Sequence, residues 1–416
     1  MSAEALRNLT LAVPLCVVCV TIAVRRPRLS SRAGVAACLG FLYAVGGVYA
    51  VEAATSWWSY LPGPTTFQGV PLETVLGWGL LWGALPVLAG GHPTMWLLGF
   101  AWVDAVTIPH LAPLVTLTDR WWIGEAVLLA TVALPALWLG RWTVTGTQLY
   151  GRVVVQMAGF SVLGLWLLPT VVLSQGGTGW PGITALPFAV RAALLVVAVA
   201  VTVPGLAAVA ELARVGRGTP FPWDPPEQLV TTGPYAYLAN PMQASATGLL
   251  TLLALACGSW WLLGLSVGAL AFCLAVANPH EDGALPRRWP AYSSYRRHVG
   301  RWWPRWRPWV PAPAALWAAG ECGVCSGIGA AIARQRPVGL VVRPAEEAGR
   351  RLVRLRWADA EGETDRGVAA LARALEHLNL AWAWLGWLLR LPMVNTAVQA
   401  VADATGLGPR ELSPRS

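Results

Sequence analysis

The sequence predicts a polytopic α-helical membrane protein of about nine transmembrane helices, followed by a small C-terminal α/β domain. Two observations predict the membrane helices. The 416 residues are 56% hydrophobic and only 12% charged, about half the charged fraction of an average soluble domain, and the apolar residues are gathered in long runs. A change of composition predicts the C-terminal domain, because roughly half of the acidic residues fall in the last quarter of the chain.

Each of the nine apolar runs approaches the ~20 residues that a helix needs to cross a bilayer core of ~30 Å. No cleavable signal is expected, because the first run is followed by Arg25, Arg26 and Arg28 rather than by small residues. The expected membrane is the plasma membrane of a bacterium. The runs cover residues 9–24, 33–52, 73–91, 93–116, 122–140, 153–174, 186–210, 243–257 and 259–277.

The net charge of +9 is carried by arginine alone, since the chain contains no lysine. These arginines lie in short loops beside the apolar runs, which is typical of topogenic charge and of contact with anionic lipid head groups rather than with nucleic acid. Placing the arginine-rich loops in the cytoplasm predicts an external N-terminus and a cytoplasmic C-terminal domain.

The longest polar interruption between apolar runs covers residues 218–243 and reads GTPFPWDPPEQLVTTGPYAYLANPMQ. Backbone groups at a membrane edge need hydrogen-bond partners, so we expect a functional site in this loop. The segment resembles the signature of integral-membrane methyltransferases related to isoprenylcysteine carboxyl methyltransferase and to phospholipid methyltransferases. The resemblance covers about 200–310. Matching or corresponding residues are Leu229, Val230, Gly233, Pro234, Tyr235, Tyr237, Asn240, Pro241, Met242, His280, Glu281, Tyr292 and Tyr295.

This resemblance implies S-adenosyl-L-methionine as cofactor and a lipophilic acceptor that enters from the bilayer. Gly233 and Pro234 would form a fixed turn near the ligand. Tyr235 and Tyr237 would offer aromatic faces to the adenine or the sulfonium. Asn240 supplies a donor and an acceptor, and Pro241 suits the first turn of a helix. The cofactor-binding candidates also include Glu281, which would bind ribose hydroxyls or the ammonium group, and His280, Tyr292 and Tyr295.

The loop departs from the family pattern at Ala239, where the family has arginine, and at Gln243, where it has tyrosine; His280 replaces the first residue of an acidic pair. These departures leave the acceptor open. The alternative is a turn at the membrane interface in which prolines end helices and tyrosines belong to an interfacial belt. Gln243 and the intramembrane Asp104 are the substrate candidates, Asp104 because buried ionisable groups are costly in a membrane; its expected neighbour is His110.

An arginine- and tryptophan-rich linker at 300–313 leads into the C-terminal domain. The sequence predicts strands at 314–319, 338–343 and 352–357, a helix after Cys325, and helices at 366–378 and 380–404. Cys322 and Cys325 form a CxxC motif at a predicted helix N-terminus, where the helix dipole lowers a thiol pKa. No second cysteine or histidine pair completes a zinc site, so no metal is expected. Cys16 and Cys19 share the spacing inside a spanning helix, where we expect packing.

About 314–412 resembles the DCC-type thiol-disulfide oxidoreductases, which are small thioredoxin-like domains. Gly320, Cys322 and Cys325 match, whereas the family's aspartate is Ala319 here. The resemblance implies redox-active cysteines and a redox partner protein.

The sequence therefore predicts helices of unknown role at 1–185, a methyltransferase-like core at 186–311 and a thioredoxin-like domain at 312–416. The predicted function is an S-adenosylmethionine-dependent membrane methyltransferase. The alternatives are a membrane-anchored oxidoreductase whose methyltransferase-like region is inactive, and a non-catalytic scaffold.

Overall fold

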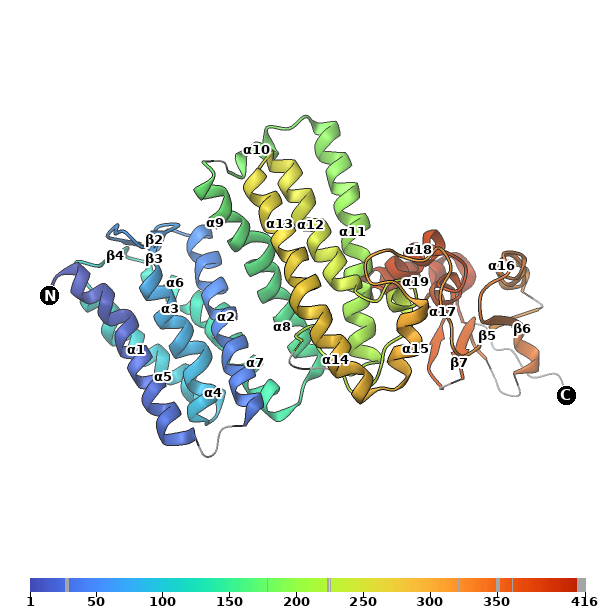
Figure 1. Ribbon diagram of the computed structural model, residues 1–416, viewed down its shortest axis with the longest axis horizontal. Coiled ribbons are helices and arrows are strands. Elements are labelled where there is room, and N and C mark those ends of the chain that lie inside the picture. The colour runs from blue at the N-terminus through green and yellow to red at the C-terminus, as the bar shows by residue number, and fades with distance from the viewer. Residues whose placement is uncertain are drawn as a thin grey trace. The chain divides into compact units, whose positions relative to one another are not determined.

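The computed structural model describes residues 1–26, 30–177, 179–222, 224, 226–320, 322–348, 352–360 and 362–409, with only the backbone at His280. The chain forms two compact units. The first comprises Met1–Gln175 with Gly218–Pro225, and the second comprises Gly176–Arg217 with Pro226–Ser416. Figure 1 labels helices and strands of both units.

The first unit is a bundle of apolar helices with two small strand pairs. Its helical elements are α1 (Ala3–Arg25), α2 (Ser31–Ala54), α3 (Leu72–Trp78), η2 (Gly79–Ala84), α4 (Leu85–Ala89), α5 (Pro93–Thr107), η3 (Ile108–His110), α6 (Trp121–Leu128), η4 (Leu129–Ala133), α7 (Leu134–Thr145), α8 (Leu149–Ser161), η5 (Val162–Leu167) and α9 (Leu168–Gln175). Its strands are β1 (Trp58–Tyr60), paired antiparallel with β4 (Val115–Leu117), and β2 (Thr66–Phe67), paired antiparallel with β3 (Val70–Pro71).

Prolines shape several of these helices. The widened π-helical segments η2, η4 and η5 each end just before a proline, namely Pro86, Pro135 and Pro169. A proline has no N–H and its ring displaces the carbonyl one turn earlier, so a wider turn at that point lets the helix continue.

The first residues of the polar loop are anchored within the first unit. Phe221 stacks on Phe160 of α8, with ring centroids 6.1 Å apart. Asp224 forms an ion pair with the buried Arg152 and accepts the Thr219 hydroxyl at 3.0 Å. This packing and pairing hold the beginning of the loop against α8.

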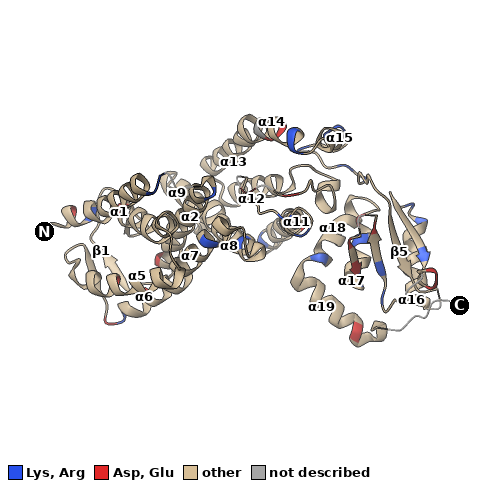
Figure 2. Cartoon of the chain, turned by 90° about the horizontal axis from the view of Figure 1, so that it is seen from below, with Lys and Arg blue, Asp and Glu red and all other residues tan. Residues whose placement is uncertain are grey.

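The helices in the N-terminal part of the second unit carry the rest of the loop. They are α10 (Pro181–Thr184), α11 (Phe188–Arg214), α12 (Pro241–Cys257), α13 (Trp260–Phe272), η7 (Cys273–Ala277), α14 (Asn278–Arg288) and α15 (Ala291–His298), with the short η6 (Gly233–Ala236) before α12. Helix α11 packs against α12, and α12 against α13. Helices α12 and α13 contain no charged residue (Figure 2).

Among the described residues, seven helices are long and apolar enough to cross a membrane, which makes this an integral membrane protein. The count of nine is not confirmed. The expected eighth span is α12, with 17 residues, and the expected fourth span is α5, with 15; these lengths correspond to ~25 and ~22 Å. The fourth prediction, 93–116, was too long, because Pro109 and Pro113 follow the end of α5 and cannot donate helical hydrogen bonds.

The C-terminal part of the second unit is a four-stranded sheet with helices. In chain order its elements are β5 (Ala314–Ala318), α16 (Gly323–Arg334), β6 (Leu340–Pro344), η8 (Ala345–Glu347), β7 (Arg356–Asp359), β8 (Thr364–Arg366), α17 (Val368–Leu375), α18 (Leu380–Arg390), α19 (Pro392–Ala402) and η9 (Asp403–Leu407). The strand order is β6-β5-β7-β8, in which β5 and β6 are parallel and the other pairs are antiparallel. Leu316 and Trp357, paired across β5 and β7, lie in its core.

The predictions for this region hold in outline and fail at particular boundaries. The strand expected at 352–357 corresponds to β7, which instead covers Arg356–Asp359. The strand β8 was not predicted. The helix expected at 380–404 is two helices, because Pro392 follows the extended Leu391 and begins α19. The helix expected after Cys325 begins at Gly323.

Candidate functional site

The centre of the polar loop is a buried turn. Gly233 has φ +60, in the left-handed region that favours glycine, and it begins the 3₁₀ turn η6. The N–H groups of Tyr237 and Leu238 both donate to the Pro234 carbonyl, each at 3.0 Å. The predicted turn at Gly233-Pro234 is therefore present, and its residues through Tyr237 are buried.

Tyr235, one of the predicted cofactor-binding residues, has a buried hydroxyl that makes no hydrogen bond to the described residues. The Tyr235 side chain is only 8% exposed. Burial, with the negative charges of Glu281 and Glu211, raises the pKa of the Tyr235 hydroxyl. The phenol therefore keeps its proton, and a bound ligand with an acceptor atom would satisfy it.

Glu281, in the first turn of α14, is close enough to three of the predicted tyrosines for its charge to act on their hydroxyls. Its charge raises the pKa of Tyr235, Tyr292 and Tyr295, in each case after the larger effect of burial. The Tyr295 hydroxyl donates to the Tyr235 carbonyl at 2.8 Å. The structure thus brings together the turn, Glu281 and the Tyr-x-x-Tyr segment of α15, whereas the His280 side chain lies outside the described residues.

Tyr237 faces the C-terminal domain instead. It is fully buried, its hydroxyl donates to the Glu376 carbonyl at 2.8 Å, and its ring meets the edge of Trp387 with centroids 5.5 Å apart. No face of this ring is open to a ligand, so its position indicates a packing role that the sequence did not predict.

Asn240 joins α12 to α14. Its amide donates to the Gln243 Oε1 at 2.9 Å and to the Asn278 Oδ1 at 2.8 Å, and Pro241 begins α12 as expected. Gln243, predicted to contact substrate, therefore uses its carbonyl oxygen within the chain. Asn278 was not predicted, because nothing in the sequence marks it as a neighbour of Asn240.

The linker after α15 covers the turn. The N–H groups of Arg305 and Trp309 donate to the Tyr237 and Ala236 carbonyls at 3.0 and 2.9 Å. Ala239, where the family has arginine, donates its N–H to the Gly300 carbonyl at 2.8 Å and packs in the apolar cluster of Tyr292 and Tyr295.

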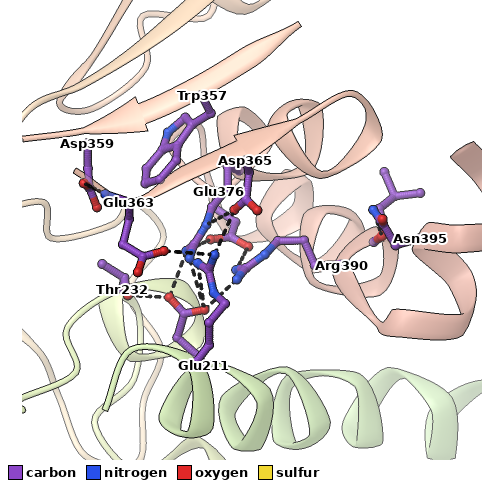
Figure 3. A network of polar contacts seen from close by, with 12 residues as sticks. Glu211, Thr232, Trp357, Asp359, Glu363, Asp365, Glu376, Arg390 and Asn395 are labelled. Atoms are coloured by element: carbon purple, nitrogen blue, oxygen red, sulfur yellow. Dashed lines mark hydrogen bonds and ion pairs between the residues drawn. The ribbon is translucent and has the colours of Figure 1, made fainter. Parts of the chain in front are cut away.

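An ion network that the sequence did not predict lies beside the turn (Figure 3). At its centre is Glu211, fully buried in the last turn of α11. Its carboxylate accepts the Thr232 hydroxyl and pairs with Arg373 at 2.9 Å and with Arg390 at 2.6 Å. Only the position of Glu211 near the end of an apolar run could have signalled it.

The two arginines of this network come from α17 and α18. Both also pair with Glu376, Arg373 at 3.2 Å and Arg390 at 2.7 Å. Arg373 further pairs with Asp365 of β8 at 3.1 Å. Burial raises the pKa of Glu376 to about 7, although Arg390 opposes the rise. The network joins the end of a membrane helix to the C-terminal domain.

The CxxC motif lies where the sequence predicted it. Cys322 is the N-cap residue of α16, and Cys325 lies in its first turn; both are half-buried. The carboxylate of Glu346, buried and not predicted, accepts the Gly320 N–H at 2.9 Å just before the motif. Among the described residues, no group of three His, Cys, Asp or Glu side chains is arranged as a metal site.

Asp104 belongs to the first unit, where it is buried in α5. Its carboxyl interacts with that of Glu125 in α6. The expected neighbour, His110, instead bonds the Val106 carbonyl at 2.9 Å and is exposed, so the pairing with His110 was wrong: the partner comes from another helix.

Comparison with protein-family models finds one match for this part of the chain. Residues 188–289 match the phospholipid methyltransferase family, a range that contains α11, the turn, α12, α13 and α14. No curated protein and no solved structure matches the chain. This match and the seven apolar helices support a membrane methyltransferase.

Proposed function

We propose that the protein is an S-adenosylmethionine-dependent methyltransferase that acts on a lipophilic acceptor, in the manner of the isoprenylcysteine carboxyl methyltransferases. One observation carries this proposal: the buried hydroxyl of Tyr235, without a hydrogen-bond partner among the described residues, lies in a glycine-led turn inside the matched segment. In the orientation that the arginine-rich loops predict, the turn and the C-terminal domain face the cytoplasm, where the cofactor is available.

The residues around the turn fit this cofactor. S-adenosylmethionine carries a sulfonium and an ammonium group, and the negative Glu281 near Tyr235 suits either cation. Tyr235 would donate to a polar atom of the ligand and, with Tyr292, would offer an aromatic ring. When bound, the cofactor would supply an electrophilic methyl group.

The chain's contribution to catalysis would be to position the two reactants. Helices α12 and α13 present uncharged, largely apolar surfaces along which a lipophilic acceptor could approach the turn. Holding the acceptor atom in line with the transferable methyl group lowers the entropic cost of the reaction. Position 239, where the family has arginine, is an alanine packed in an apolar cluster and carries no charge. A carboxylate on the acceptor would therefore need a cation from elsewhere in the chain.

Calorimetric titration of the detergent-purified full chain with S-adenosylmethionine tests the proposal. We expect saturable binding, which Tyr235→Phe weakens about tenfold, or ~1.4 kcal/mol, through loss of one hydrogen bond to a charged ligand. Glu281→Gln should weaken it as well. Tyr150→Phe makes the same change at a side chain that is 65% exposed and should leave the affinity unchanged. Folded protein without saturable binding would refute the proposal.

A second activity, thiol-disulfide exchange, is favoured by the position of Cys322. The parallel strands β5 and β6 are joined through α16, whose N-cap is Cys322; this supports a thioredoxin-like fold. The Cys322 thiolate would attack a disulfide of a partner protein. The Cys325 thiolate would then break the mixed disulfide, which leaves the partner as a dithiol and this chain with a Cys322–Cys325 disulfide.

The rate at which the Cys322 thiol is alkylated, measured as a function of pH, tests the thiol-disulfide activity independently of the methyltransferase activity. A Cys325→Ser variant should show a Cys322 thiol that reacts with a midpoint well below the usual pKa near 8.5, and a Cys16→Ser change should not alter it. A midpoint at or above that value would leave the C-terminal domain without redox function and would say nothing against the methyltransferase.

A further inference from the structure

The C-terminal domain contacts the methyltransferase turn in two places, and the first contact runs through the carboxylate of Glu211. This side chain is fully buried at the end of α11. Arg390 Nη2 lies 2.6 Å and Arg373 Nη2 3.2 Å from its Oε2 atom, and Arg373 Nη1 lies 2.9 Å from Oε1. A buried charge needs such partners, and two of the cations that satisfy this one come from the C-terminal domain.

The same carboxylate sets the position of the turn. Its Oε1 accepts the hydroxyl of Thr232, the residue immediately before Gly233. A Cβ atom on Gly233 would lie 3.2 Å from both Cγ and Cδ of Glu211, so the glycine backbone rests directly on this side chain. Movement of Glu211 would therefore displace the first residues of the turn that carries Tyr235.

A second connection joins the other end of the turn to the same domain. The Tyr237 hydroxyl donates to the Glu376 carbonyl, and its ring packs against Trp387 of α18. The Glu376 carboxylate in turn pairs with both arginines. The turn is thus fixed before Gly233 through Glu211, which pairs with arginines of α17 and α18. It is fixed after Tyr235 by Glu376, the residue that follows α17, and by Trp387 of α18.

We propose that the C-terminal domain holds the cofactor turn in its binding conformation, with Glu211, Arg373 and Arg390 as positioning residues. This inference rests on the proposed methyltransferase function. It assigns the domain a role at the methyltransferase site that is independent of its cysteines: undocking of α17 and α18 would release Glu211, loosen the turn and lower the affinity for cofactor.

Thr232→Val is the sharpest test. It replaces the threonine hydroxyl by a methyl group of similar volume, so the hydrogen bond to Glu211 is lost while every ion pair stays intact. In the full chain we expect faster hydrogen exchange at the amides of residues 232–238 and a Kd for S-adenosylmethionine raised about fivefold or more, with exchange in α17 and α18 unchanged. Arg390→Gln should produce both effects more strongly. Arg334→Gln, an exposed arginine of the same domain, should produce neither.

Two readouts keep the inference separate from the proposed function. If the wild-type chain does not bind S-adenosylmethionine, the methyltransferase proposal fails, and exchange at residues 232–238 still decides whether the domain holds the turn. If wild type binds but Thr232→Val and Arg390→Gln both leave the Kd and the local exchange unchanged, the positioning role is refuted. Cys322→Ser should affect neither quantity, since the contacts do not involve the cysteines.

Discussion

Replacement of Gly233 by alanine tests how rigidly Glu211 is held. The substitution adds one methyl group at φ +60, where an L-residue is strained, and places it 3.2 Å from two carbon atoms of Glu211. The chain provides a matched control in Gly258, between α12 and α13, which also has φ +60 but has nothing within 4 Å of the added Cβ.

The two variants separate backbone strain from crowding. Left-handed backbone costs an alanine ~1–2 kcal/mol at either position. At Gly233 the Glu211 side chain would also have to move by a few tenths of an ångström, although its carboxylate is held by Arg373 and Arg390. Crowding of this kind in a packed interior costs ~1–3 kcal/mol. We therefore expect Gly233→Ala to lower the free energy of unfolding by ~2–5 kcal/mol and Gly258→Ala by ~1–2 kcal/mol.

Denaturant-induced unfolding in mixed micelles, followed by tryptophan fluorescence, measures the two free energies. Calorimetric titration adds a functional readout: Gly233→Ala should weaken binding of S-adenosylmethionine, whereas Gly258→Ala should leave it as in wild type. Equal destabilisation by the two substitutions would show that Glu211 yields freely, and the reasoning about a rigid contact would then be wrong.

Three further predictions concern the C-terminal domain. Tyr237→Phe should lower the free energy of unfolding by ~1–3 kcal/mol in the same assay, because it leaves the buried Glu376 carbonyl without its donor. Burial raises the pKa of Glu376 from 4.5 to about 7, so between these pH values the folded state binds a proton that the unfolded state has released. The free energy of unfolding should therefore fall as the pH rises from about 4.5 to about 7. Glu376→Gln should make this fall with pH less steep, and an unchanged slope would contradict the prediction. Oxidation with a disulfide reagent should shift the mass of wild type by two hydrogens and leave Cys322→Ser without an internal disulfide.

The apolar spans were predictable because they depend on local composition. A run of about twenty apolar residues forms a helix in a membrane whatever lies elsewhere in the chain. The errors occurred where local chemistry interrupts such a run: Pro109 and Pro113 follow the shortened α5, and Pro392 divides the expected last helix. The strand β8 has three residues, too few to show a pattern.

The candidate site was predictable only where it is formed by residues that are close together in the sequence. The Gly233-Pro234 turn could be read from adjacent residues. The two tyrosines at i and i+2 were both assigned to the cofactor, but a 3₁₀ turn has three residues per turn, so Tyr235 and Tyr237 point to different sides. The pairing of Glu211 with Arg373 and Arg390 joins positions 162 and 179 residues apart, and no local pattern can indicate a contact of that separation.

The ion network also bears on why these two regions share one polypeptide. The ribosome synthesises α11, with Glu211 in its last turn, before it reaches Arg373 and Arg390, which follow 162 and 179 residues later. Covalent fusion supplies those counter-ions in a one-to-one ratio and at a high effective concentration. A chain truncated at the linker would leave the buried Glu211 carboxylate without Arg373 and Arg390. Among the described residues, its remaining ion-pair partner would then be Arg214 of the same helix, at 3.7 Å.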